Sequence, residues 1–269
     1  MERTNASHAI RKAGAMAALL VIAILCGSQC GFAERDTAVL NLEPLPVGVT
    51  LPVQLSRTLR AGKVRIGTTI ILKTTQRVPV GQHLYLQGNA ELRGEVIESD
   101  AGDGTSARPA TLALRFTSLR YHHQNVAVMT KAIAIANFTE VADTFLPATG
   151  GPDRGNASPA SWTTAQVGGD EVYRSGWIGD VCDSVMRKVG YADYYGVYSL
   201  PAKQTTNDGP TLPRAMGVFS TTAAGLYGFD ANSTLSSAAG VVTIVGGSKN
   251  LIVRNGDNLL LEVIALPRE

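Results

Sequence analysis

LPVGVTLPVQL, residues 45–55, is the stretch that decides the fold class of this chain. From Val49 onward every second residue is apolar, which is the pattern of a β-strand with one buried face. Pro46 and Gly48 precede this run; a proline fixes φ and a glycine permits a positive φ, as a sharp corner requires. Pro52 cannot donate a backbone hydrogen bond, so we predict that this strand lies at a sheet edge or enters through a bulge.

The rest of the first half repeats this β pattern. Short apolar or alternating runs, bounded by glycine and proline, occupy residues 66–80, 92–96, 112–116 and 126–138. A cluster of turn formers at 100–106 separates two of them, and no convincing helix lies between the runs. Strands at such spacing predict a small β-barrel or β-sandwich over residues 34–148.

The second half is also predicted to be β-rich, with one short helix. Turn formers without apolar periodicity fill residues 149–161, which we interpret as a linker to a second domain over 162–269. Valines recur every four residues after an aspartate that could act as a cap, and they predict a helix near 180–190. The segment NGDN, residues 255–258, lies between apolar runs and predicts a β-hairpin.

Residues 1–33 have the pattern of a signal peptide. Three basic residues precede an uncharged apolar run over 15–25, and Gly31-Phe32-Ala33 offers small residues for cleavage before Glu34. The apolar run is too short to span a bilayer comfortably, although an uncleaved anchor is the alternative. We therefore expect an exported protein, periplasmic or extracellular, with no membrane span after cleavage.

Charge and cysteine content narrow the possible partners and the sources of stability. The chain has 24 basic and 22 acidic residues; removal of residues 1–33 takes away three basic residues and one acidic residue, so the charges balance. A chain without net charge is not expected to attract nucleic acid. Cys182 alone remains of three cysteines, so the exported part cannot form an internal disulfide and must rely on its core. We expect Cys182 to be a buried, small apolar residue.

Three short motifs carry a resemblance to a known module. Residues 45–55 follow the pattern LPxGxxLxVxL, residues 78–84 with 92–96 are similar to hPxGxxLxGxV with an insertion, and residues 112–119 fit LxLxFxxL. In this order they resemble the C-terminal β-barrel of the channel-forming scaffold subunit of type IV secretion systems. They also resemble a β module of uncharacterised exported bacterial proteins, to whose tails residues 162–170 and 215–220 are faintly similar.

The resemblance covers about residues 45–136 and implies a fold more than an activity. The secretion subunit inserts a long amphipathic helix between barrel strands to form its pore. Residues 98–109, which would hold that insertion, are short, polar and glycine-rich here. Pore formation is therefore not implied for this chain, and an accessory role in a secretion apparatus is one alternative function.

The sequence contains no convincing catalytic or metal-binding motif. His122 and His123 are adjacent, so in a strand they would point to opposite faces and only one could join a metal site. Nucleophile-elbow and phosphate-binding loop patterns are absent. The acids Asp180 and Asp183 are better explained as helix-capping residues. We predict no cofactor and no metal, and we lean against an enzyme.

A cluster of aromatic residues is the best candidate for a binding face. Aromatic side chains with polar tips are common where proteins bind sugars or peptides, although packing in a small core is the alternative. The candidate face comprises Trp177, Tyr191, Tyr194, Tyr195 and Tyr198, with Asp170 and Glu171 nearby in sequence.

These observations predict an exported, non-enzymatic cell-envelope protein that binds or scaffolds an envelope protein or polymer. One way to bind would be strand addition at an exposed edge such as the strand that carries Pro52. A secreted hydrolase of cell-wall or polysaccharide material, acting through Asp170 and Glu171, is the second alternative function.

Overall fold

The protein is mainly β, as predicted. A computed structural model describes residues 44–105, 107–121, 124–146, 161–201, 212–247 and 250–267. This part of the chain contains nineteen strands and one helix, α2 (Phe138–Asp143), and none of its helices is long and apolar enough to cross a membrane. The predicted signal peptide, residues 1–33, and all of the predicted linker except Ser161 lie outside the described residues.

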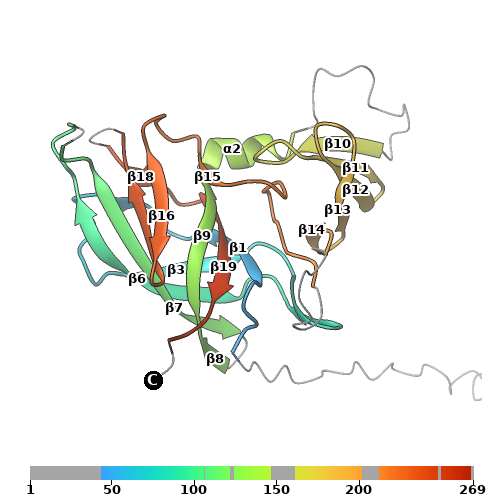
Figure 1. Ribbon diagram of the computed structural model, residues 1–269, viewed down its shortest axis with the longest axis horizontal. Helices are drawn as coiled ribbons and strands as arrows, with labels where there is room; N and C mark the ends of the chain where they lie inside the picture. The colour runs from blue at the N-terminus through green and yellow to red at the C-terminus, as the bar shows by residue number, and fades with distance from the viewer. Residues whose placement is uncertain are drawn as a thin grey trace, which may run out of the picture. The chain divides into compact units, whose positions relative to one another are not determined.

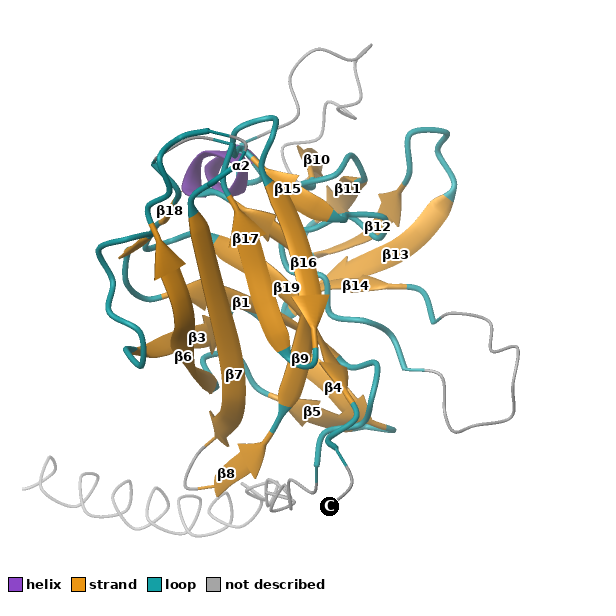
Figure 2. Ribbon diagram, turned by 60° about the vertical axis from the view of Figure 1, so that its left-hand side comes forward, coloured by secondary structure: helices purple, strands orange, loops and turns teal. Residues whose placement is uncertain are grey.

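The large sheet has ten strands, nine of them in the order β15-β9-β19-β1-β3-β6-β7-β17-β16, with β8 pairing with β7 (Figure 1). Its strands are β1 (Thr50–Leu55), β3 (Thr69–Thr74), β6 (Glu91–Asp100), β7 (Thr111–Tyr121), β8 (Gln124–Ala127), β9 (Met129–Ala136), β15 (Gly225–Tyr227), β16 (Thr234–Ala238), β17 (Val241–Val245) and β19 (Asn258–Ile264). The sheet curls, so that β16, at one end of the strand order, lies beside β9 near the other end (Figure 2). There the backbone N–H of Ala132 in β9 donates to the hydroxyl of Ser237 in β16 at 2.9 Å.

A small antiparallel sheet has five strands that follow one another in chain order (Figure 1). They are β10 (Ser161–Ala165), β11 (Glu171–Ser175), β12 (Ile178–Cys182), β13 (Lys188–Asp193) and β14 (Gly196–Ser199). Two further pairs are β2 (Leu59–Arg60) with β18 (Ile252–Val253), and β4 (Val78–Gly81) with β5 (Leu84–Leu86).

The two halves of the chain share the large sheet. The sequence predicted a second domain over 162–269, but only residues 161–199 build the small sheet. Strands β15, β16, β17 and β19 return to the large sheet, where β19 lies between β9 and β1 and β17 pairs with β7. The sequence could not reveal this return, because strand pairing over more than a hundred residues leaves no local pattern.

The prediction of a helix near 180–190 is wrong. These residues form the end of β12, a turn and the start of β13. A spacing of four residues is a multiple of two, so the valine pattern also fits a strand. Asp183 does not cap a helix: its carboxylate accepts the backbone N–H groups of Val185 and Arg187, at 3.1 and 2.9 Å, and holds the turn. Cys182 is buried, as predicted.

The predicted hairpin around 255–258 is also wrong, although the turn itself exists. The strands on its two sides do not pair with each other: β18 pairs with β2, and β19 pairs with β1 and β9. The turn residue Asp257 is fully buried, and its carboxylate accepts the N–H of Phe138 at 2.7 Å and that of Arg254 at 2.6 Å. This carboxylate fastens the turn to the start of α2.

The strand that carries Pro52 is not a sheet edge, contrary to the prediction. Strand β1 lies between β19 and β3, and so it offers no free edge for strand addition. The carbonyl of Pro52 accepts the N–H of Thr75 at 2.9 Å, which places the proline nitrogen on the side where β3 has just ended at Thr74. The ladder between β1 and β19 is therefore intact despite the missing donor.

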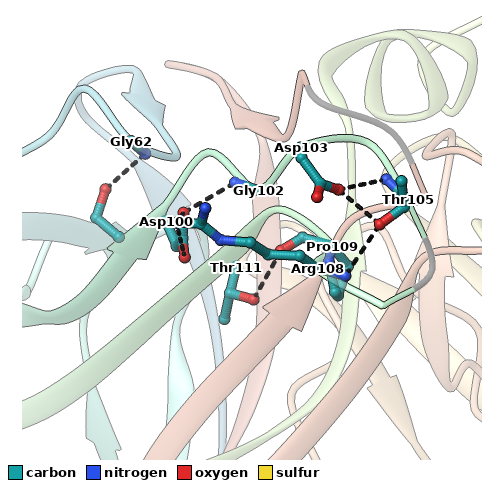
Figure 3. A network of polar contacts seen from close by, with 9 residues as sticks. Gly62, Asp100, Gly102, Asp103, Thr105, Arg108, Pro109 and Thr111 are labelled. Carbon is teal, nitrogen blue, oxygen red and sulfur yellow. Dashed lines mark hydrogen bonds and ion pairs between the residues drawn. The ribbon is translucent and has the colours of Figure 1, made fainter.

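The predicted turn cluster at 100–106 connects β6 and β7 (Figure 3). Asp100 accepts the N–H of Gly102 at 2.9 Å and forms an ion pair with Arg108, while Asp103 accepts the N–H and hydroxyl of Thr105 (Figure 3). The hydrogen bond from Gly102 and the ion pair lower the pKa of Asp100. These carboxylates therefore stabilise a tight connection.

One apolar core joins the two sheets. It contains Val172, Val181, Ala192 and Val197 of the small sheet and Ala134, Ala136 and Leu260 of the large sheet. Residues of the intervening segments, including Met216 and Phe219, fill the space between them. Strand β19 is buried at five of its first six positions because layers cover both of its faces.

The side chain of Gln76 ties the small sheet to the large one. Its amide oxygen accepts the N–H groups of Val197 and Gly217, at 3.0 and 2.9 Å, and its amide nitrogen donates to the carbonyl of Val197 at 3.0 Å. Gln76 is 7% exposed. A Cβ atom at Gly196 would lie 2.4 Å from the amide carbon of Gln76, so this close approach requires the glycine.

We predict that Gln76→Glu lowers the free energy of unfolding by about 3 kcal/mol at neutral pH, because a buried carboxylate oxygen would face the carbonyl of Val197. Chemical denaturation measures the change. The control is Gln82→Glu on the exposed turn between β4 and β5, which should stay within about 0.5 kcal/mol of the native chain. Equal stability of the two variants would contradict this role of Gln76.

We further predict that Asp257 gives stability a characteristic pH dependence. Burial raises the pKa of Asp257 above its ordinary value of 3.8. A raised pKa means that its contribution to stability is fully present below that ordinary value and is lost as the pH rises through the folded-state pKa. In urea unfolding series, the stability of the native chain relative to Asp257→Asn should fall with rising pH.

The matched control for this prediction is Asp183→Asn, for which the sign is opposite. Hydrogen bonds from Arg187 lower the pKa of Asp183, so its contribution is lost as the pH falls. If the native chain and Asp257→Asn differed by the same free energy at every pH, the expected shift at Asp257 would be disproved.

Candidate functional site

Two tight turns at one end of the small sheet present aromatic side chains to solvent. Trp177 lies in the turn between β11 and β12, and Tyr194 lies in the turn between β13 and β14. Because consecutive turns of a meander alternate between the two ends of a sheet, these two turns lie at the same end. Trp177 is 56% and Tyr194 is 68% exposed, and their rings contact each other at a tilt of 35°, with centroids 4.7 Å apart.

The edge strand β10 adds Trp162 to this group. Its ring meets that of Trp177 edge to face at a centroid distance of 6.2 Å. In the antiparallel register Trp162 is opposite Arg174 of β11, and the guanidinium of Arg174 lies 5.9 Å from the centre of the Trp162 ring. We call Trp162, Arg174, Trp177 and Tyr194 the aromatic surface.

The aromatic surface lies on the same face of the small sheet as part of the apolar core. Val172 and Arg174 are two residues apart on β11 and so point to the same face. Val172 is fully buried, whereas Arg174 is partly exposed. The neighbour of Arg174 on β12 is Gly179, which has no side chain. The face therefore changes within two residues from packed core to accessible aromatic and basic groups.

A second group, the arginine stack, lies on the other side of the β13–β14 turn. The guanidinium of Arg77 lies between the rings of Tyr85 and Tyr195, 4.2 and 3.7 Å from their centroids. It also forms an ion pair with Asp193 at 3.9 Å. Asp193 fixes the turn because its carboxylate accepts the N–H groups of Tyr195 and Gly196, at 2.7 and 3.1 Å.

The structure divides the tyrosines that the sequence grouped as one face. Tyr191 and Tyr198 are cross-strand neighbours whose rings stack at 5.2 Å. Tyr198 is 1% exposed, its hydroxyl donates to the carbonyl of Arg77, and burial raises its pKa to about 12. These two residues are therefore packing residues, and of the predicted aromatic residues only Trp177 and Tyr194 belong to the aromatic surface.

The two predicted acids are held by different parts of the chain. Asp170 is 3% exposed, and one of its carboxylate oxygens accepts the N–H and the hydroxyl of Thr221, at 2.6 and 2.7 Å. Glu171 accepts the hydroxyl of Tyr173 at 2.6 Å. Asp170 thus holds the loop after β14 against the β10–β11 turn, which is a structural role.

Sequence reasoning missed Trp162 and Arg174. A signal for them exists: two alternating runs, SWTTA and EVYRS, flank the glycine pair 168–169, and pairing them about this turn places Trp162 opposite Arg174. The predicted helix at 180–190 hid the meander to which these strands belong.

Reactive groups do not converge in the described part of the chain. None of its His, Cys, Asp and Glu residues gather in a group of three that could hold a metal ion. A hollow of about 230 Å³ beside Tyr85 is lined by Pro79, Gly81, Gln82, His83, Leu212 and Pro213, and it contains no carboxylate or thiol. The adjacent histidines, His122 and His123, lie outside the described residues.

Comparison of the chain with models of protein families, with curated proteins and with solved structures finds no match.

The structural role of Asp170 predicts a stability effect. Asp170→Ala should lower the free energy of unfolding by about 2 kcal/mol, because it removes a buried carboxylate and leaves the partly buried donors of Thr221 unsatisfied. Asp180→Ala is the matched control: Asp180 pairs with Lys188, both half exposed, and its loss should cost about 0.5 kcal/mol or less. Thermal or urea unfolding compares them, and an unchanged stability of Asp170→Ala would refute the structural role.

Proposed function

We propose that this protein is an exported, non-enzymatic component of the cell envelope that binds another envelope component through the aromatic surface. The observation that carries the proposal is the pair Trp177 and Tyr194. Both rings are more than half exposed, and each is held in a two-residue turn between paired strands.

Exposed aromatic rings at fixed positions favour binding over packing. Leaving large rings in water forgoes about 25 cal/mol of stabilisation for each Å² of apolar area that could be buried. Tryptophan and tyrosine are also the residues most enriched at the energetic centres of interfaces, since they give much contact area for little loss of conformational entropy. The contact between the tilted rings of Trp177 and Tyr194 reduces that loss further, because it restricts both rings before a ligand arrives.

The hydrolase alternative has less support than binding. It needs two carboxylates that face a common substrate. The carboxylate of Asp170 is buried against Thr221, and that of Glu171 contacts Tyr173. The accessory role in secretion rests on the resemblance of residues 45–136 alone, and export itself remains a prediction from residues 1–33.

The test is cosedimentation of the purified protein with insoluble cell-wall and membrane fractions. We expect the native chain to sediment with one of them, and the double variant Trp177→Ala, Tyr194→Ala to bind at least about tenfold more weakly. Ile66→Ala removes a side chain of similar exposure, 67%, from the loop before β3 and should bind like the native chain. Failure of the native chain to sediment with any fraction, or equal binding by the double variant, would overturn the proposal.

A further inference from the structure

We infer that the ligand of the aromatic surface is an acidic glycan, a polymer of pyranose rings that carry carboxylates. This inference rests on the proposed binding function and specifies its ligand. It combines two features of the surface, which are a guanidinium that no carboxylate of the described residues engages and flat rings that are open to solvent.

Arg174 supplies the unpaired positive charge. Among the described residues, no hydrogen bond or ion pair engages its guanidinium, and its Nε atom is buried without a hydrogen-bond partner. Partial burial also lowers the pKa of this side chain. Asp193 is near enough to favour the charged form of Arg174, but its carboxylate forms the ion pair with Arg77. A carboxylate from a ligand would give Arg174 the partner that the described residues do not provide.

The other basic residues of the small sheet already have partners. Within residues 161–201, Arg187 pairs with Asp183 at 2.8 Å and Lys188 pairs with Asp180. Arg174 is the exception, and its guanidinium lies 5.9 Å from the centre of the Trp162 ring, which in turn contacts the exposed Trp177. The coincidence of an unpaired cation with open rings is the charge complementarity that an acidic ligand requires.

Ring stacking favours a sugar over other anions. The C–H face of a pyranose packs on the flat face of an aromatic ring, while the indole N–H and the phenol hydroxyl can bond its hydroxyl groups. The rings of Trp177 and Tyr194 are tilted by 35° with centroids 4.7 Å apart, and Trp162 meets Trp177 edge to face at 6.2 Å, so a polymer has more than one ring to contact. One cation beside three rings favours a ligand that is bound mainly through its rings, whereas nucleic-acid binding draws on several basic residues that neutralise phosphates.

The two tryptophans provide a direct readout. The chain has only two, Trp162 and Trp177, and both belong to the aromatic surface. Intrinsic tryptophan fluorescence of the purified protein therefore reports ligand arrival at this surface alone. Titrations would use an oligogalacturonate, a neutral cello-oligosaccharide of the same length, and an oligoglutamate of the same charge.

We expect the oligogalacturonate to bind more tightly than either reference ligand. Arg174→Gln should weaken its binding about tenfold, which is the effect of losing one charge-assisted contact, and should leave the weak binding of the cello-oligosaccharide unchanged. Arg187→Gln is the matched control, since Arg187 is exposed and already paired, and it should bind like the native chain.

Three results would overturn the inference. Equal binding of the acidic and the neutral glycan, with no effect of Arg174→Gln, would remove the role of charge. Binding of oligoglutamate as tight as that of the oligogalacturonate would identify an acidic protein as the partner. Absence of binding to the oligogalacturonate, while envelope fractions still sediment with the protein in a Trp177-dependent manner, would refute the acidic glycan and leave the proposed binding function standing.

Discussion

The amide group of Gln76 is the constraint on which the arrangement of the two sheets depends. It forms two hydrogen bonds with the backbone of Val197, donating to the carbonyl and accepting from the N–H, and it accepts a third hydrogen bond from the N–H of Gly217. A buried amide has few other ways to meet its hydrogen-bonding needs. Strand β14 therefore has one position relative to the large sheet, and the turn that begins at Asp193 is placed with it.

The position of the aromatic surface follows from this anchor. Tyr195 contacts Arg77, the residue next to Gln76, and thereby holds the β13–β14 turn from one side. Tyr194, the other residue of that turn, is left to point toward Trp177. Both rings of this two-residue turn are more than half exposed, but Tyr195 is held against the guanidinium of Arg77 and Tyr194 against the ring of Trp177.

Sequence reasoning identified local β structure where one face of a strand is buried. The alternation at 92–96 and 112–116 and the turn formers at 100–106 correspond to β6, β7 and the loop between them. It failed where the pattern fits two structures equally. Valines four residues apart suit a strand as well as a helix, and NGDN makes a turn whether or not its flanking strands pair. The sequence identified part of the candidate site, namely Trp177 and Tyr194. Arg174 could not be identified in the same way, because its place beside Trp162 depends on the pairing register of β10 and β11.

The sequence by itself determined that this chain is mainly β and that sharp corners end its strands, because residue alternation and glycine or proline turns are local properties. Only the tertiary structure decided which strands are neighbours, since β15, β17 and β19 join the large sheet by pairing with strands that are far away in the sequence. It also decided which aromatic side chains remain exposed. Tyr194 and Tyr198 are the same residue type in neighbouring parts of the sequence. The hydroxyl of Tyr198 donates to the carbonyl of Arg77, just before β4, and Tyr198 is buried, whereas Tyr194 is exposed to solvent.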